Sequence, residues 1–360
     1  MRIIHTGDIH LGSAFKNLPP DRAAVRRSEI LDGFRRLCTF AKEQGVSAVL
    51  IAGDLFDERK VPRSLQQEVA NIFEKASPVC FFYVSGNHDG TFAIENLPKN
   101  VCTFSNSQGW RSYDLPENIT ITGADSAYFS AGLFHALTLR QERYNILLLH
   151  GEIARIETGN SDCVPLARLQ NKGVDYLALG HIHIPNRTLE RLDGRGVYRY
   201  CGCLEGRGFD ECGERGFFLL DIQNGRLVGE QFFTLAKRKI LECGVDISAC
   251  ESYYDVESAV RAALTNVRAD DIVKVVLLGR HKVGLRKDIP LLTARLLQSY
   301  FYAKVVDNSR LALDFNAFSN DLSERGEFVK EVGRYELNDE ERAEILDVGL
   351  KALAGEEIDL

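Results

Sequence analysis

Five short segments of this 360-residue chain carry side chains of the types that can bind divalent metal ions. They read Gly7-Asp8-Ile9-His10, Gly53-Asp54, Gly86-Asn87-His88-Asp89, His150-Gly151 and Gly180-His181-Ile182-His183. A lone Gly-Asp is usually a turn, and a lone histidine is usually structural. However, five of the eight histidines lie in these segments. Chance alone is a poor explanation for so many potential ligands in segments of the same kind. The pattern therefore indicates a metal centre.

The spacing within two segments brings ligands together. Asp8 and His10 are two residues apart, as are His181 and His183. Because residues i and i+2 of an extended segment point the same way, each pair can offer two ligands to one site. The neighbouring glycines permit tight turns and close backbone approach.

Each segment follows a short apolar run that is typical of a strand buried on both faces. The runs are Arg2–Thr6, Ser47–Ala52, Cys80–Ser85, Asn145–Leu149 and Asp175–Leu179. Helical patterns over about 21–44 and 64–75 separate the first three, which predicts a layered α/β domain. Since ligands bind at the carboxyl ends of strands in open α/β sheets, the five segments are expected to meet there.

The rest of the chain predicts two further parts. Residues 197–235 read as β-hairpins, and residues 240–306 read as a β-α-β-α-β unit. The last fifty residues read as two amphipathic helices. We therefore predict a domain with the metal centre over 1–237, a small α/β domain over 238–308 and a helical segment over 309–360.

Composition points to a cytoplasmic protein without membrane spans. Apolar residues make up 45% and charged residues 26%, and no apolar run approaches the ~20 residues that span a bilayer. The nine cysteines are an odd number without a CxxC pair, which favours reduced thiols. The net charge is −7, but residues 333–360 hold nine acids and three bases, so the remainder is nearly neutral and leaves room for a local basic surface.

The ordered set of segments resembles the pattern of the calcineurin-like metallophosphoesterase superfamily, which is GDxH, GD, GNH(D/E), a lone His and GHxH. The resemblance implies an α/β fold with a four-layer β-sandwich core and flanking helices. It also implies two divalent metal ions, one held by Asp8, His10 and His183 and the other by Asn87, His150 and His181, with Asp54 bridging them. A mixed nitrogen and oxygen shell suits Mn²⁺, with Fe²⁺ and Zn²⁺ as alternatives, better than Ca²⁺ or Mg²⁺.

Such a centre suits phosphate chemistry. Two divalent cations outweigh the charges of Asp8 and Asp54, so the centre attracts a phosphodiester and can activate a water molecule. His88 matches the family's catalytic histidine, which would protonate the leaving oxygen or stabilise the transition state. Asp89 is expected to orient His88.

The finer pattern resembles the SbcD-type DNA repair exonucleases, and most closely their YhaO-like bacterial branch. The matching stretches are IIHTGDIHLG, VLIAGDLFDERKVP, VSGNHDG, YLALGHIH and the hairpin around residues 207–217. The resemblance covers about residues 1–235. It implies a DNA nuclease with 3′→5′ exonuclease action on duplex ends and endonuclease action on single strands. It also implies a homodimer, a capping domain (238–308) that holds DNA, and a C-terminal segment (309–360) that docks an ABC-type ATPase.

The chain departs from that group at Tyr200-Cys201-Gly202-Cys203, where the group has a Gly-Ser step. Substrate contacts there are therefore in doubt. Cys201, Cys203 and Cys212 could form a small metal site, but their spacing lacks a fourth ligand of the zinc-finger kind, and buried thiols are the simpler interpretation.

A dense basic loop offers candidate contacts to DNA phosphates. It consists of Arg280, His281, Lys282, Arg286 and Lys287, and the alternative is an ordinary solvated loop. The terminal helices could likewise pack on their own domain instead of on an ATPase. Two other functions stay open: an esterase for phosphoproteins or small phosphoesters, and a scaffold that binds DNA ends or the ATPase without cutting.

Overall fold

The computed structural model describes residues 1–89, 97–104, 109–154, 162–282, 284–312 and 321–355. The chain forms two compact units, 1–237 and 238–360, each with a hydrophobic core of its own. Within the described residues, no helix is both long enough and apolar enough to cross a lipid bilayer.

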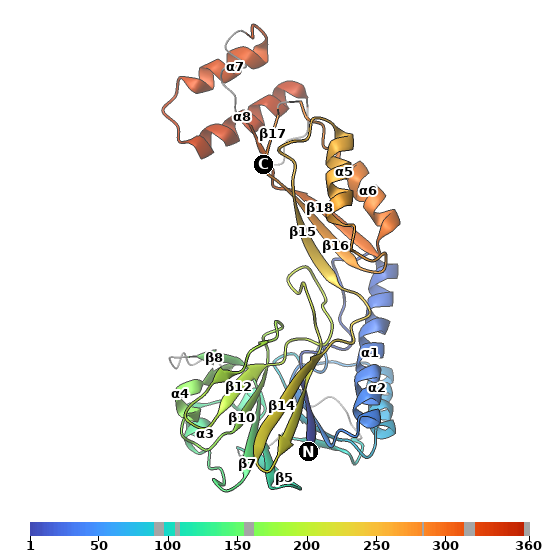
Figure 1. Ribbon diagram of the computed structural model, residues 1–360, viewed down its shortest axis with the longest axis vertical. Coiled ribbons are helices and arrows are strands. Elements are labelled where there is room, and N and C mark those ends of the chain that lie inside the picture. Colours follow the sequence, from blue (N-terminus) through green and yellow to red (C-terminus); the bar gives the residue numbers. More distant parts are fainter. Residues whose placement is uncertain (90–96, 105–108, 155–161, 283, 313–320, 356–360) are drawn as a thin grey trace. The chain divides into compact units, whose positions relative to one another are not determined.

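Two six-stranded sheets form the first unit (Figure 1). The first has the order β14-β13-β1-β2-β3-β4, with β1 (Arg2–Thr6), β2 (Ala48–Ala52), β3 (Cys80–Val84), β4 (Val101–Thr103), β13 (Phe217–Gln223) and β14 (Arg226–Phe233). The second has the order β11-β12-β10-β7-β6-β5, with β5 (Arg111–Leu115), β6 (Ile119–Gly123), β7 (Tyr144–His150), β10 (Tyr176–Gly180), β11 (Glu190–Arg191) and β12 (Val197–Tyr200). A separate pair joins β8 (Glu152–Ala154) to β9 (Cys163–Pro165).

Successive residues of the central strands enter two different cores, which explains their unbroken apolar runs. The helices of this unit are α1 (Pro20–Glu43), α2 (Arg63–Lys75), α3 (Ala131–His135) and α4 (Leu166–Leu169), with a short 3₁₀ turn at Ser126–Tyr128. In β2, Val49 packs in the core with α1 and α2, whereas Leu50 packs between the sheets. Leu147 of β7 packs in a third core with α3 and α4. The layers therefore run helices, sheet, sheet, helices (Figure 1), and the expected α/β four-layer fold is confirmed.

The topology brings the carboxyl ends of five strands to one edge. Neighbouring strands in the trio β1, β2 and β3 are parallel, so their chains leave the sheet at the same end. Strands β7 and β10 are also parallel, and His150 lies opposite Gly180 in their register. All five ligand segments begin at or just after these ends.

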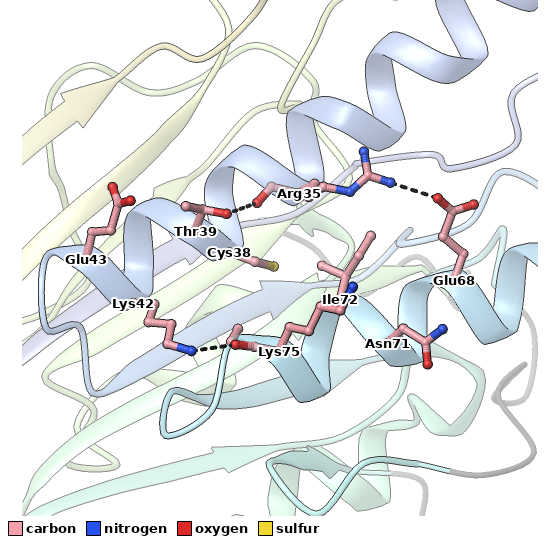
Figure 2. Close-up of a pocket in the computed structure, with 10 residues that line it drawn as sticks. Arg35, Cys38, Thr39, Lys42, Glu43, Glu68, Asn71, Ile72 and Lys75 are labelled. Atoms are coloured by element: carbon pink, nitrogen blue, oxygen red, sulfur yellow. Dashed lines mark hydrogen bonds and ion pairs between the residues drawn. The ribbon is translucent and has the colours of Figure 1, made fainter.

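A pocket of about 610 Å³ lies between α1 and α2 (Figure 2). Charged side chains link the two helices across it: Arg35 Nη2 donates to Glu68 Oε1 at 2.7 Å, and Lys42 Nζ donates to the Lys75 carbonyl at 2.7 Å. The lining residues all come from α1, α2 and the residue that follows α2. The pocket is therefore separate from the ligand segments.

The second unit has a parallel three-stranded sheet in the order β15-β16-β18. Its elements are β15 (Ile240–Asp246), α5 (Tyr253–Ala263), β16 (Ile272–Leu278), β17 (Arg280–His281), α6 (Ile289–Ser299), β18 (Tyr302–Asp307), β19 (Arg310–Leu311), α7 (Glu324–Gly333) and α8 (Asp339–Ala354). Helices α5 and α6 cover one face of this sheet (Figure 1). Val329 and Val332 of α7 pack with Leu346 and Leu350 of α8 and with Leu311. The division at 308/309 into a capping domain and a docking segment stays a prediction.

Candidate metal centre

The loops after β1 and β2 are interlocked by backbone hydrogen bonds. The Asp8 amide donates to the Gly53 carbonyl at 3.0 Å, and the His10 amide donates to the Asp54 carbonyl at 3.0 Å. Four side chains that the motifs single out stand on backbone with positive φ: Asp8 (48°), His10 (50°), Asp54 (48°) and His181 (98°). Such conformations cost about 1–3 kcal/mol each and cluster at functional sites.

One group of candidate ligands consists of Asp8, His10 and His183, whose ligand atoms lie within 4.8 Å of one another. Nδ1 of His10 lies 3.0 Å from Asp57 Oδ1, and Nδ1 of His183 lies 2.6 Å from Glu211 Oε1. Because an ionised carboxylate only accepts hydrogen bonds, both Nδ1 atoms carry the proton. In the neutral form of each ring this leaves Nε2 with its lone pair, and the two Nε2 atoms lie 3.2 Å apart, an arrangement that a cation between them would stabilise.

Both carboxylates in this arrangement are held ionised. Burial alone would raise the pKa of Glu211, but its hydrogen bond to His183 and the nearby Arg207 guanidinium lower that pKa to about 2. For Asp57 as well, the contacts with His10 and Arg207 outweigh burial and lower the pKa from its ordinary value. Both carboxylates therefore act as acceptors at the Nδ1 atoms of His10 and His183.

A second group of acceptor atoms converges beside the first. His150 Nδ1 donates to the Ala52 carbonyl at 2.9 Å, so its Nε2 is also unprotonated. That Nε2 lies 2.8 Å from Asn87 Oδ1 and 3.4 Å from Asp54 Oδ2. The His181 ring stands edge-on to the His150 ring, with 5.2 Å between the ring centroids. The structure therefore brings together all seven side chains expected to bind metal.

Asp8 and Asp54 contribute two buried carboxylates to these groups. Asp8 accepts from the His181 amide at 2.9 and 3.0 Å, and Asp54 Oδ1 accepts from the His88 amide at 2.9 Å. Burial and the neighbouring Asp54 raise the pKa of Asp8 well above its ordinary value. Buried carboxylates of this kind require compensating positive charge, so this donor set fits divalent cations.

Three glycines are required for this close approach. A Cβ on Gly53 would lie 2.3 Å from His150 Nδ1, and one on Gly86 would lie 2.2 Å from Asp54 Oδ1. A Cβ on Gly180 would lie 1.9 Å from the Ala52 carbonyl oxygen. Each distance is shorter than any real contact of a Cβ, which explains the glycines before Asp54, Asn87 and His181.

The sequence model of the family described as Calcineurin-like phosphoesterase matches residues 1–185. The chain belongs to this family. The protein is thus a metal-dependent phosphoesterase, and the family and enzyme class expected from the motifs are confirmed.

Three relatives of the phosphoesterase differ in how much of each chain is shared. It is 28% identical over 241 residues to the "Uncharacterized metallophosphoesterase YhaO" of Bacillus subtilis, covering 62% of this chain and 58% of that one. It is 25% identical to the "DNA double-strand break repair protein Mre11" of Haloferax volcanii, covering 98% and 75%. It is 25% identical to one subunit of the nuclease SbcCD of Escherichia coli K12, covering 87% and 93%. The chain therefore spans little more than half of YhaO's length.

The His88 ring contacts a backbone carbonyl and not the Asp89 carboxylate that was expected to orient it. Its Nδ1 lies 2.9 Å from the carbonyl oxygen of Asp57, and its exposed ring stands edge-on to the His10 ring. The fully buried Asp89 instead accepts hydrogen bonds from three backbone amides, those of Leu55, Phe56 and Gly86. Asp89 therefore braces the loops after β2 and β3, and the expectation that it orients His88 is corrected.

Three residues of the phosphoesterase's centre were missed from the sequence: Asp57, Arg207 and Glu211. They contact one another and the outer nitrogens of His10 and His183. The sequence gave only a weak indication of these three residues. Asp57 comes three residues after a ligand, and the other two lie in the segment RGFDE, whose similarity to the SbcD group gave no role.

The five basic residues expected to contact DNA have different surroundings. Lys282 pairs with Glu251 at 2.6 Å, Lys287 pairs with Asp307 at 2.5 Å, and His281 is buried. Arg280 and Arg286 are exposed, and neither has a carboxylate partner among the described residues. Their contact with DNA stays a prediction.

The cysteines of the phosphoesterase form no disulfide. Cys201 and Cys203 are buried, and Cys212 Sγ contacts the Phe209 carbonyl at 3.2 Å. In the described part of the chain, no cysteine belongs to a group that could hold a metal ion. The buried-thiol interpretation therefore fits Cys201 and Cys203 better than a cysteine metal site.

Proposed function

We propose that the protein is a DNA nuclease that depends on two divalent metal ions, with Mn²⁺ as the first candidate and Fe²⁺ or Zn²⁺ as alternatives. The observation that carries the proposal is the convergence of unprotonated Nε2 atoms and carboxylates in two adjacent groups, next to the exposed His88. Relatives described as part of a nuclease and as a DNA break repair protein support DNA as the substrate. The finer activity we propose is 3′→5′ exonuclease action on duplex ends, with endonuclease action on single strands.

The side chains of the centre have three proposed roles: binding the cations, donating a proton and supporting the loops. Asp8, His10 and His183 would hold one cation, Asn87, His150 and His181 the other, and Asp54 would contact both. When bound, such a pair lowers the pKa of a water molecule and stabilises negative charge on phosphate. Because His88 Nδ1 is occupied by the Asp57 carbonyl, Nε2 is the atom that can deliver a proton to the leaving oxygen. Asp89 keeps the backbone of both loops in place.

We further propose that the protein acts in the cytoplasm as a homodimer with an ABC-type ATPase. The relative from Escherichia coli is named as one component of the nuclease SbcCD, which supports an assembly of several chains. Around α7 and α8, the apolar side chains of Leu322, Tyr335, Ile345 and Leu353 are exposed. These residues offer a surface for the ATPase, as amphipathic helices do when they bind a groove.

The test is incubation with Mn²⁺ and either end-labelled duplex DNA, end-labelled single-stranded DNA or p-nitrophenyl phosphate. We expect cleavage of DNA by the wild type and a loss of about 10²–10⁴-fold in His88→Asn, because the proton donor is removed. Titration with Mn²⁺ should show that this variant still binds metal. Metal-loaded wild type that leaves DNA intact, or that hydrolyses the nitrophenyl ester far faster than DNA, would overturn the proposal.

A further inference from the structure

The imidazoles of His10 and His183 are both held by carboxylates. Asp57 accepts from His10 Nδ1 at 3.0 Å, and Glu211 accepts from His183 Nδ1 at 2.6 Å. A carboxylate in this place fixes the tautomer and orientation of a ligating imidazole and raises its basicity. Both effects increase the affinity of Nε2 for a cation.

Arg207 joins the two carboxylates. Nη1 donates to Asp57 Oδ1 at 2.8 Å, Nη2 donates to Glu211 Oε1 at 3.0 Å, and the backbone amide donates to Glu211 Oε2 at 2.7 Å. Only 19% of the Arg207 side chain and 4% of the Glu211 side chain are exposed, so these charge-assisted bonds are largely shielded from water. We call Asp57, Arg207 and Glu211 the Arg207 clamp. It fixes residues 207–211 against the loop after β2.

The second group of ligands has a weaker support. His150 Nδ1 donates to the neutral carbonyl of Ala52 at 2.9 Å. Asn87 contributes a neutral oxygen there, and Asp8 lies with His10 and His183 but also with Asp54 and His150, so the asymmetry comes from the groups behind the imidazoles. A carboxylate attracts a cation and polarises an imidazole more strongly than a neutral carbonyl does. A cation is therefore expected to bind more tightly to Asp8, His10 and His183 than to Asn87, His150 and His181.

We propose that Asp57 and Glu211, joined by Arg207, are positioning residues that make the Asp8–His10–His183 position the tighter of two cation positions. The inference rests on the metal-dependent function proposed above, but it concerns binding and not cleavage. The first equivalent of a divalent cation occupies this position, and the second equivalent occupies the position of Asn87, His150 and His181.

The test is calorimetric titration of the metal-free full chain with Mn²⁺. We expect two binding steps for the wild type. Glu211→Gln and Asp57→Asn should each lower the Mn²⁺ affinity of the tighter step by about 10–100-fold and leave the affinity of the weaker step unchanged. The matched control is Glu214→Gln, which removes an exposed carboxylate of the same segment that pairs with Arg187, and both of its steps should equal those of the wild type. The visible absorption of one equivalent of Co²⁺ should change in Glu211→Gln and not in the control, because it reports the coordination of the first ion.

Crystals of the wild type with one equivalent of Mn²⁺ locate the first ion through its anomalous scattering. A peak between His10 and His183 is expected, and a peak beside His150 would overturn the inference. Glu211→Gln that binds within twofold of the wild type, or that loses both steps equally, would also overturn it. Since no DNA is present, the two proposals fail separately: normal Mn²⁺ binding by Glu211→Gln removes the clamp's role alone, and a wild type that binds as expected without cutting DNA removes the nuclease alone.

Discussion

At the scale of single residues, the centre depends on which ring nitrogen of each histidine is protonated. His10, His183 and His150 all place Nδ1 against an oxygen acceptor. In the neutral form of each ring, Nε2 is therefore the nitrogen left with a lone pair for a cation. The acceptors belong to loops and strand ends that are remote in sequence, so the chemistry of each imidazole is set by tertiary contacts.

His5 shows the opposite use of a histidine, as a neutral part of the core. Its Nδ1 contacts the Tyr176 hydroxyl at 3.0 Å, and burial together with the nearby Arg199 lowers its pKa to about 3. The unfolded chain, with an ordinary pKa of 6.5, binds the proton first, so stability falls as the pH falls from 6.5 toward 3 and is unaffected above. Between pH 7 and pH 5.5 this group should remove about 1 kcal/mol from the free energy of unfolding.

Urea unfolding of the wild type and of His5→Asn at these two pH values measures that effect. The variant should be less stable at pH 7, because it loses the contact with Tyr176, but it should lose about 1 kcal/mol less than the wild type on acidification. Equal losses in the two proteins would contradict a neutral, buried His5.

The recurrence of the five segments at strand ends predicted a shared metal centre, and the resemblance to the calcineurin-like family supplied the set of seven candidate ligands. It did not predict the Arg207 clamp. Arg207 meets Asp57 across 150 residues of sequence, and no local pattern encodes that contact. The role expected of Asp89 was wrong for the same reason, since a carboxylate next to His88 in sequence points to the backbone of another loop.

At the scale of elements, the central strands were predictable because both faces are buried and their apolar runs are continuous. Strands β4, β5 and β6 were missed because they are short or polar. Thr120 and Thr122 of β6 are buried, but each hydroxyl is hydrogen-bonded, to Asp114 and Ser112 respectively. Threonine can therefore take the place of an apolar residue in this strand. As a result, β6 lacks the continuous apolar run by which a buried strand is predicted from sequence.

Gly180, at the end of β10, keeps the two sheets close at the metal centre. In Gly180→Ala the new methyl group would lie 1.9 Å from the Ala52 carbonyl oxygen of β2, and backbone cannot move aside easily. We expect a loss of about 1–3 kcal/mol in the free energy of unfolding, together with weaker Mn²⁺ binding. Urea unfolding and Mn²⁺ titration measure the two effects.

The matched control for that substitution is Gly194→Ala, because no atom lies within 4 Å of a Cβ added there. It should change stability by less than about 0.5 kcal/mol. A Gly180→Ala protein as stable as this control would show that the sheets can separate at this point without cost.

At the scale of the whole molecule, charge decides how a polyanion can be bound. The chain carries a net charge of −7, so its summed field gives DNA no general attraction. Any affinity for DNA must come from local cations. Three of the five predicted basic contacts are buried or paired, which the sequence could not reveal because Glu251 and Asp307 are 31 and 20 residues away from their partners. Of these five residues, the exposed Arg280 and Arg286 are the ones that can contact DNA phosphates.

We therefore expect Arg280→Gln and Arg286→Gln each to weaken DNA binding and to reduce the slope of log affinity against log salt by about 1, since each removes one phosphate contact. Lys287→Gln is the matched control from the same loop. Its Nζ is already bound by Asp307 and Ser309, so its loss should lower the stability of the second unit without changing the salt slope. Fluorescence anisotropy of labelled duplex DNA between 50 and 200 mM salt measures all three slopes. Arginine variants with the wild-type slope would place the DNA contacts outside this loop.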